Sequence, residues 1–93
     1  MHKQYEIRIS GRVQGVGFRA AARRQARYLQ LKGWVENLPD GSVRAVINGD
    51  AENCTEFIHW CREGSAYSWV EDLDIREMEP ENLGPFEINY WPR

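Results

Sequence analysis

The sequence predicts an α+β fold, a two-layer sandwich with two helices packed on one face of a mainly antiparallel sheet of four to five strands. Two observations support this prediction. Short segments in which apolar and polar residues alternate, as in half-buried strands, occur together with two longer segments whose apolar residues recur at helical spacing. Their order is strand, helix, strand, strand, helix, strand, with one short strand added at the end.

The first strand and the first helix have the clearest periodicity. Apolar residues alternate with polar ones over Tyr5–Ser10, and Gly11 is expected to end this strand. From Phe18 onward, apolar residues fall on one side of a helix at about 100° per residue. This spacing predicts an amphipathic helix that runs from Phe18 to about Gln30.

The middle of the chain predicts a β-hairpin. Gly33 allows the chain to leave the helix, and Trp34–Leu38 is typical of a second strand. The Asp-Gly step within residues 39–42 is a strong hairpin signal. We therefore expect the partner strand over Val43–Asn48.

The last part of the chain predicts a second helix and two further strands. Asp50 is well placed to cap a helix from Ala51 to about Glu63. A fourth strand with uneven alternation is expected over Trp69–Met78. Apolar residues at alternate positions mark a short fifth strand: Phe86, Ile88 and Tyr90. The whole order is that of the split arrangement called ferredoxin-like.

Composition indicates one globular domain, expected over residues 1–93 as a cytoplasmic monomer. A hydrophobic share of 42% is enough for one compact core. The net charge of -2 argues against a protein that wraps nucleic acid or coats an acidic membrane. No apolar run approaches the roughly 18 residues of a membrane span, and the first residues lack the apolar stretch of a secretory signal. We expect neither a nucleic-acid partner nor a membrane partner.

The cysteines and histidines predict neither a disulfide nor a metal site. Cys54 and Cys61 are seven residues apart in the predicted helix, so their Cα atoms would lie about 10 Å apart. A disulfide needs Cα atoms within about 7 Å, so we interpret both as reduced core thiols. His2 and His59 are distant in sequence and show no metal-ligand spacing, and His59 lies on the outer helix face. We therefore expect no metal and no cofactor.

The predicted topology brings two distant segments together. A crossover helix joins the first two strands, so they run the same way and their carboxyl ends lie at the same end of the sheet. The segment Gly11–Phe18 leaves the first strand there, and Asn37 lies near the end of the second strand. Ligands often bind outside the carboxyl ends of strands joined by crossover helices, so a site is expected at this end.

The segment Gly11–Arg19 is a candidate phosphate site. Its glycines allow successive backbone N–H groups to point into one concavity, and the helix start adds unpaired N–H donors with a partial positive charge. Arg19 could hold two phosphate oxygens with its planar guanidinium. Alone, the glycines would indicate a tight turn and Arg19 a solvated side chain, but together they favour phosphate. No Lys-Ser or Lys-Thr pair follows, so we expect a site for one phosphate group rather than a nucleotide loop.

Two segments, Gly11–Arg19 and Leu31–Gly41, resemble the signatures of the acylphosphatase family, and the similarity extends over nearly the whole chain. The resemblance implies that Arg19 binds the phosphate and that Asn37 orients the attacking water. It implies a cradle of backbone amides from Gly15, Val16, Gly17 and Phe18. The implied reaction hydrolyses a small-molecule acyl phosphate to a carboxylate and inorganic phosphate, without a metal or cofactor.

The sequence departs from the family pattern at Ala20–Ala22 and in the 64–69 loop, which holds Tyr67 and Trp69. These departures concern the part of the pocket that would hold the acyl group rather than the residues that would bind the phosphate. Three alternatives remain open. An RNA-recognition domain would carry aromatic residues on its third strand, and Val43–Asn48 has none. The second alternative is a domain that binds carbamoyl phosphate within a larger maturation protein, although we interpret the chain as free-standing. The third is a catalytically weak relative of the family that has another role.

Overall fold

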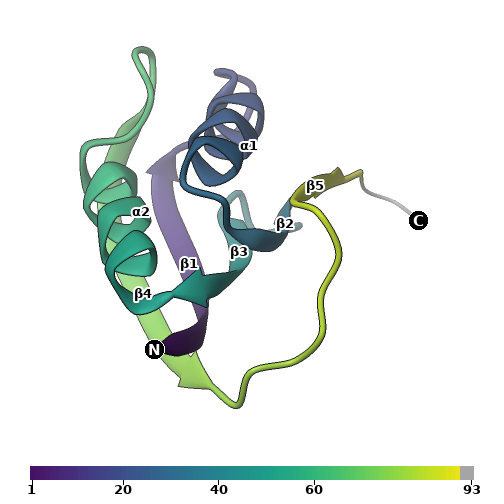
Figure 1. Ribbon diagram of the computed structural model, residues 1–93. Coiled ribbons are helices and arrows are strands. Elements are labelled where there is room, and N and C mark those ends of the chain that lie inside the picture. The colour runs from purple at the N-terminus through teal and green to yellow at the C-terminus, as the bar shows by residue number, and fades with distance from the viewer. Residues whose placement is uncertain (91–93) are drawn as a thin grey trace.

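The structure, a computed structural model, describes residues 1–90; residues 91–93, the last of the predicted 1–93 domain, lie outside the described residues. Both helices pack on the same face of a five-stranded sheet (Figure 1). The predicted two-layer α+β fold, with its order of elements, is confirmed. The elements are β1 His2–Arg12, α1 Phe18–Tyr28, β2 Lys32–Asn37, β3 Val43–Asp50, α2 Ala51–Glu63, β4 Trp69–Met78 and β5 Glu87–Asn89.

The strand order in the sheet is β4-β1-β3-β2-β5. β3 pairs antiparallel with both β1 and β2, so these two strands run in the same direction, as predicted. β5 pairs parallel with β2, with Asn89 opposite Glu36. The carboxyl ends of β1, β2 and β5 therefore lie at one end of the sheet, called here its carboxyl end.

β1 extends beyond both of its predicted bounds. Its first residues pair with the end of β3, where His2 lies opposite Asp50. The prediction that Gly11 ends the strand is wrong, because the strand continues to Arg12 after a register shift between Ser10 and Gly11. A Cβ on Gly11 would lie 2.1 Å from the carbonyl oxygen of Trp69, so glycine here allows β1 and β4 to approach closely.

α1 ends at Tyr28, two residues before the predicted end. Gln30 adopts a left-handed conformation with φ 58°, and its N–H donates to the carbonyl oxygen of Arg27 at 3.0 Å. The N–H of Leu31 donates to the carbonyl oxygen of Ala26 at 2.8 Å. These two bonds form a Schellman motif, with glutamine where glycine is usual. The apolar periodicity therefore predicts a helix that is two residues too long, because it includes Leu29 and Gln30, which belong to the C-terminal cap.

The hairpin and the second helix are close to their predicted bounds. β2 covers Lys32–Asn37 rather than Trp34–Leu38. It begins earlier because Lys32 already pairs with Asn48 of β3, and it ends earlier because Leu38 belongs to the turn, where its N–H donates to the carbonyl oxygen of Ser42 at 2.8 Å. α2 has its predicted bounds, and the carboxylate of Asp50 accepts from the N–H of Glu52 at 3.3 Å. The cap interpretation of Asp50 is confirmed.

The core lies between the helices and the sheet. The ring of Phe57 on α2 lies 6.1 Å from that of Phe86 and 5.7 Å from that of Trp60. Cys54 and Cys61 are free thiols, and their predicted place in the core is confirmed. Desolvation raises the pKa of Cys54 to about 11 and also raises the pKa of Cys61. Both thiols are therefore protonated and unreactive at neutral pH.

The connection between β4 and β5 crosses the sheet, because these strands lie at its opposite edges (Figure 1). Two buried side-chain amides hold this connection against the face of the sheet opposite the helices, called here the helix-free face. Oε1 of Gln4 accepts from the N–H of Glu81 at 2.8 Å and from Nδ2 of Asn48 at 2.9 Å. Nδ2 of Asn48 also donates to the carbonyl oxygen of Glu81 at 2.9 Å. The Gln4–Asn48–Glu81 cluster thus fixes the path along which the chain reaches β5.

Candidate active site

The segment Val13–Gly17 joins β1 to α1 at the carboxyl end of the sheet. Gly15 and Gly17 have φ values of 76° and 80°, in the left-handed region that favours glycine, and a Cβ on either would meet no atom within 4 Å. Gly17 caps α1 without a side-chain hydrogen bond, and the first turn holds no acidic residue. The first N–H groups of α1, with their partial positive charge, are therefore open to an anion.

Arg19 lies in the first turn of α1, beside a pocket of about 150 Å³. Drug-sized ligands occupy pockets of about 300–1,000 Å³, so this one suits a single small group such as phosphate. The lining residues come from the loop, from α1 and from β5 with the residue that follows it: Val13, Gly15, Gly17, Phe18, Arg19, Ala20, Ile88 and Tyr90.

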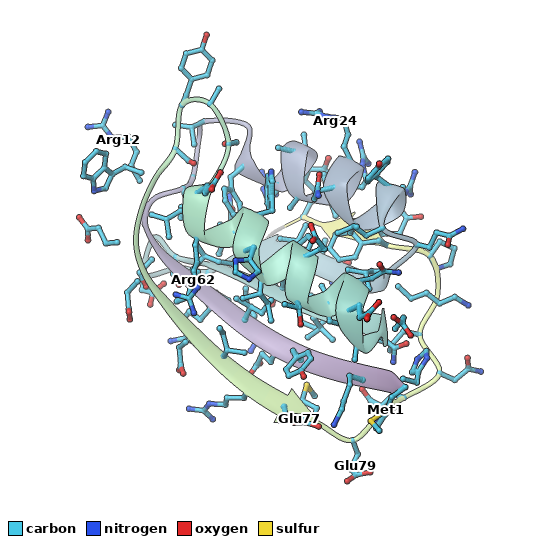
Figure 2. All side chains as sticks on the ribbon, turned by 60° about the vertical axis from the view of Figure 1, so that its left-hand side comes forward. Met1, Arg12, Arg24, Arg62, Glu77 and Glu79 are labelled. Carbon is cyan, nitrogen blue, oxygen red and sulfur yellow. The ribbon has the colours of Figure 1, made fainter. Side chains whose placement is uncertain are left out.

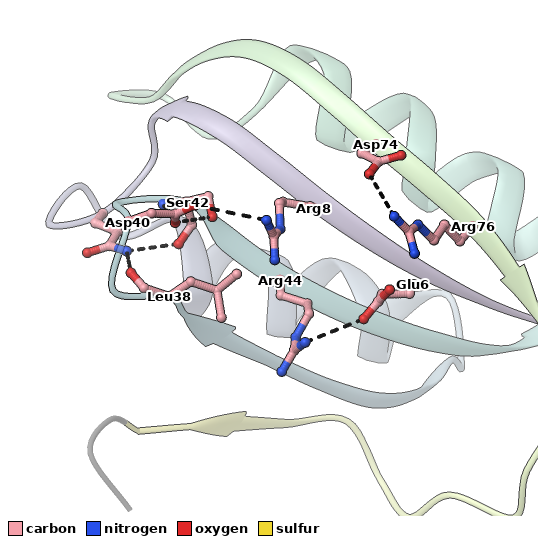
Figure 3. A network of polar contacts seen from close by, with 9 residues as sticks. Glu6, Arg8, Leu38, Asp40, Ser42, Arg44, Asp74 and Arg76 are labelled. Carbon is pink, nitrogen blue, oxygen red and sulfur yellow. Dashed lines mark hydrogen bonds and ion pairs between the residues drawn. The ribbon is translucent and has the colours of Figure 1, made fainter.

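Arg19 differs from the arginines of the helix-free face in having no carboxylate partner among residues 1–90. Arg8 lies 4.0 Å from the carboxylate of Asp40, and Arg44 lies 3.6 Å from that of Glu6 (Figure 3). Those guanidinium groups are already engaged by negative charge. Arg19 is half-buried at the pocket, so its charge is available to a bound anion.

Asn37 is the last residue of β2 and lies opposite Val43 of β3. Its Oδ1 atom is buried and has no hydrogen-bond partner among the described residues. A buried polar atom without a partner costs about 1–3 kcal/mol. This cost favours a functional role for the side chain over a merely structural role at the end of the strand.

Gln14 links the loop to the β2–β3 turn. Its Nε2 donates to the carbonyl oxygens of Leu38 and Ser42, both at 2.8 Å, and the turn is shown in Figure 3. Within this turn, hydrogen bonds from the hydroxyl and the N–H of Ser42 lower the pKa of Asp40. Because Leu38 follows Asn37 directly, Gln14 holds the loop close to the end of β2. Sequence reasoning missed Gln14, whose only signal was an amide side chain among loop glycines.

The structure brings some of the predicted site residues together and leaves others apart. Arg19 lines the pocket with Gly15, Gly17 and Phe18, whereas Val16 and Asn37 do not line it. Val16 is half-buried and packs against the core. The side chain of Phe18 is buried, so only its backbone can face a ligand. Asn37 lies at the same end of the sheet, beside the turn that binds Gln14.

Tyr90 is a pocket residue that sequence reasoning used only to mark the fifth strand. The guanidinium carbon of Arg19 lies over its ring, 5.1 Å from the ring centroid. The alternation of Phe86, Ile88 and Tyr90 was the available signal, because it puts all three on the side of the sheet that faces the helices. Nothing in that pattern specified Arg19 as the neighbour.

Other parts of the described structure offer weaker candidates. Within residues 1–90, no three His, Cys, Asp or Glu side chains are grouped so that they could hold a metal ion. None of the described helices has the length and apolar character needed to cross a membrane.

A separate pocket of about 470 Å³ borders the 64–69 loop, with Arg12, Tyr67 and Trp69 in its lining. Arg12, the last residue of β1, lies apart from Arg24 of α1 (Figure 2).

Known proteins resemble this chain over most of its length. The acylphosphatase family model matches residues 5–88. An acylphosphatase of Thermococcus kodakarensis is 48% identical over 82 residues, which cover 88% of this chain and 90% of that protein. The crystal structure of acylphosphatase from Bacillus subtilis superposes with a TM-score of 0.92 and 37% identity, over 97% of this chain and 100% of that one.

A longer protein shows the same fold in a small part of its length. Full-length HypF, in a phosphate- and nucleotide-bound form, gives a TM-score of 0.85 and 26% identity over 97% of this chain, but over only 12% of HypF. The family match and the relative from Thermococcus kodakarensis cover nearly all of this chain. The chain is therefore an enzyme of the acylphosphatase family, as its two sequence segments predict.

Proposed function

We propose that this chain hydrolyses the anhydride bond of small-molecule acyl phosphates, without a metal, and gives a carboxylate and inorganic phosphate. The observation that carries the proposal is the small pocket at the start of α1. Left-handed glycines, a helix N-terminus without a side-chain cap and an arginine with no carboxylate partner in the described part of the chain meet there. All three features favour one compact anionic group.

In this proposal, the chain binds the phosphate group from two sides. Arg19 holds two of its oxygens through the planar fork of N–H groups, and the backbone amides of Gly15, Val16, Gly17 and Phe18 donate to the remaining oxygens. Phosphoryl transfer spreads negative charge over these oxygens in the transition state. Donors fixed before the reaction stabilise that charge without reorganising, which lowers the barrier.

Asn37 orients the water in this proposal. Its buried Oδ1 has no hydrogen-bond partner among residues 1–90, so it can accept a hydrogen bond from a water molecule. The water oxygen then forms a bond to phosphorus, while the bond between phosphorus and the acyl oxygen breaks and the carboxylate leaves with the bonding electron pair. One water proton stays on the new P–OH group, and the other passes to a phosphate oxygen. Asn37 therefore acts by position and not as a base.

Metal independence follows from the leaving group. A carboxylate is stable as an anion, so its departure requires neither a general acid nor a metal ion to neutralise it. The work left to the protein is positioning and stabilisation of charge on the phosphoryl oxygens. Arg19 and backbone amides supply that stabilisation in the proposed site, and no cofactor is needed.

The test is hydrolysis of benzoyl phosphate by purified protein in excess EDTA. Arg24→Ala is the matched control, because Arg24 is an exposed arginine on the same helix and does not line the pocket. We expect chelator-resistant hydrolysis by the wild type and by Arg24→Ala. Arg19→Ala should lose at least about tenfold in kcat/KM, since hydrogen bonds to charged groups contribute about 1.5–3 kcal/mol.

Folded wild-type protein without hydrolysis above background would contradict the proposal. The same variants would then be tested for binding of inorganic phosphate and carbamoyl phosphate, the alternative in which the site only binds. Activity that EDTA abolishes and added metal restores would contradict metal independence alone.

A further inference from the structure

We infer that Tyr90 is a positioning residue that holds the guanidinium of Arg19 over the phosphate pocket. The inference rests on the proposed phosphate role of Arg19. Its basis is the ring contact, in which the guanidinium carbon lies over the Tyr90 ring at 5.1 Å from the centroid. This distance is within the roughly 6 Å at which a cation and an aromatic face attract each other. Both side chains also line the same pocket.

Sheet topology brings Tyr90 to the carboxyl end of the sheet. β5 runs parallel to β2, and Asn89 lies opposite Glu36. Tyr90 follows Asn89 as Asn37 follows Glu36, so the two chain segments reach the same level. The loop after β1 and the end of β2 are found there too. Tyr90 therefore lies where the proposed reaction takes place, although it is distant in sequence from both signature segments.

α1 and β5 are held together at both ends of their contact. At one end, Nε of Arg27 donates to the carbonyl oxygen of Phe86 at 3.0 Å, and the same guanidinium lies 3.2 Å from the carboxylate of Glu87. At the other end, Arg19 contacts Tyr90. Eight residues of helix span about 12 Å, and four residues of extended chain span about 13 Å. The two contacts are thus in register, and Arg27 fixes the strand that presents Tyr90.

An aromatic ring suits this position better than a carboxylate would. The ring contacts the flat face of the guanidinium, whereas phosphate oxygens bind to the N–H groups at its edge. A carboxylate would occupy those same N–H groups and repel the phosphate. Tyr90 therefore restrains a long, flexible side chain without competing for its hydrogen-bond donors. Restraint before binding reduces the entropy lost when phosphate arrives.

The experiment compares inorganic phosphate binding by calorimetry in the wild type, Tyr90→Phe and Tyr90→Leu. Tyr90 is 63% exposed, so the variants should fold, which thermal unfolding checks. Tyr28→Leu is the matched control, because Tyr28 is an exposed tyrosine at the opposite end of α1. We expect Tyr90→Leu to weaken phosphate binding about two- to fivefold, while Tyr90→Phe and Tyr28→Leu retain the wild-type Kd. The KM for benzoyl phosphate should rise by the same factor in Tyr90→Leu.

The NMR signal of the Arg19 Nε–H group tests the ring contact without any ligand. Its ring-current shift should disappear in Tyr90→Leu and persist in Tyr90→Phe. An unchanged shift or an unchanged phosphate Kd in Tyr90→Leu would overturn the inference, as would equal loss in Tyr90→Phe. Wild-type protein that binds phosphate but does not hydrolyse benzoyl phosphate contradicts the proposed function and leaves this comparison decisive. Wild-type protein that binds no phosphate contradicts both.

Discussion

At the residue scale, Arg19 and Asn37 have surroundings that fit different tasks. Within residues 1–90, Arg19 borders the pocket with a guanidinium that has no carboxylate partner, whereas Oδ1 of Asn37 is a buried acceptor without a hydrogen-bond partner. Arg19→Ala is therefore expected to raise the phosphate Kd and to lower kcat/KM. Asn37→Ala should lower kcat by about a hundredfold, since misplaced reactants cost about that much, with little change in the phosphate Kd. Steady-state kinetics with benzoyl phosphate, and competitive inhibition by inorganic phosphate, separate the two effects.

A single control strengthens the assignment of Asn37. Asn37→Asp keeps the shape and one acceptor oxygen but adds a negative charge close to the site. It should weaken phosphate binding, which Asn37→Ala should not. Near-normal kcat in Asn37→Ala would show that the buried Oδ1 does not orient the water.

The predicted site residues were those whose evidence is local. Arg19 follows a glycine-rich segment at a helix start, so residue types and spacing identify it. The role of Asn37 is the one implied by the resemblance of Leu31–Gly41 to a family signature. Gln14 and Tyr90 could not be assigned in this way. Their roles depend on contacts with segments 24 and 71 residues away in sequence, as the Gln14–Leu38 and Arg19–Tyr90 contacts show.

At the element scale, the loop before α1 depends on Gln14 for its position beside the β2–β3 turn. Gln14→Leu keeps the approximate size of the side chain but removes both hydrogen bonds to the turn. We expect the free energy of unfolding to fall by about 1–3 kcal/mol. Phosphate binding should weaken as well, because the loop amides lose their anchor. Urea unfolding and calorimetry measure the two effects.

Gln25→Leu is the matched control for Gln14→Leu, since Gln25 lies on α1 and its side chain makes no hydrogen bond within the described residues. A Gln14→Leu variant with wild-type stability and phosphate affinity would show that the glycine loop holds its shape alone.

The element boundaries show where local patterns lose information. The centres of all seven elements were predicted, because burial on one face imposes periodicity there. Their ends depend on partners. β1 begins at His2 because β3 continues to Asp50, and α1 ends at Tyr28 because Gln30 takes a left-handed conformation. Neither cause is visible as hydrophobic alternation.

At the scale of the whole molecule, the strand order determines which side chains meet at the pocket. β4 and β5 are consecutive in sequence but lie at opposite edges of the sheet. The chain between them must therefore cross the helix-free face before β5 can pair with β2 and present Tyr90 to Arg19 (Figure 1). Periodicity predicts which face of a strand is buried but not which strands are neighbours, so this path could not be predicted from the sequence.

The crossing is held at its midpoint by the Gln4–Asn48–Glu81 cluster, in which Gln4 is fully buried and Asn48 is 2% exposed. Asn48→Ala removes the donor to Oε1 of Gln4 and to the carbonyl oxygen of Glu81, and it leaves that carbonyl oxygen without its donor, so the free energy of unfolding should fall by about 2–3 kcal/mol. The expected fall in Tm is roughly 8–24 °C, measured by calorimetry. Asn53→Ala on α2 is the matched control. A wild-type Tm for Asn48→Ala would show that the hydrogen bonds of Asn48 do not stabilise the connection, which Gln4 alone would then hold at Glu81.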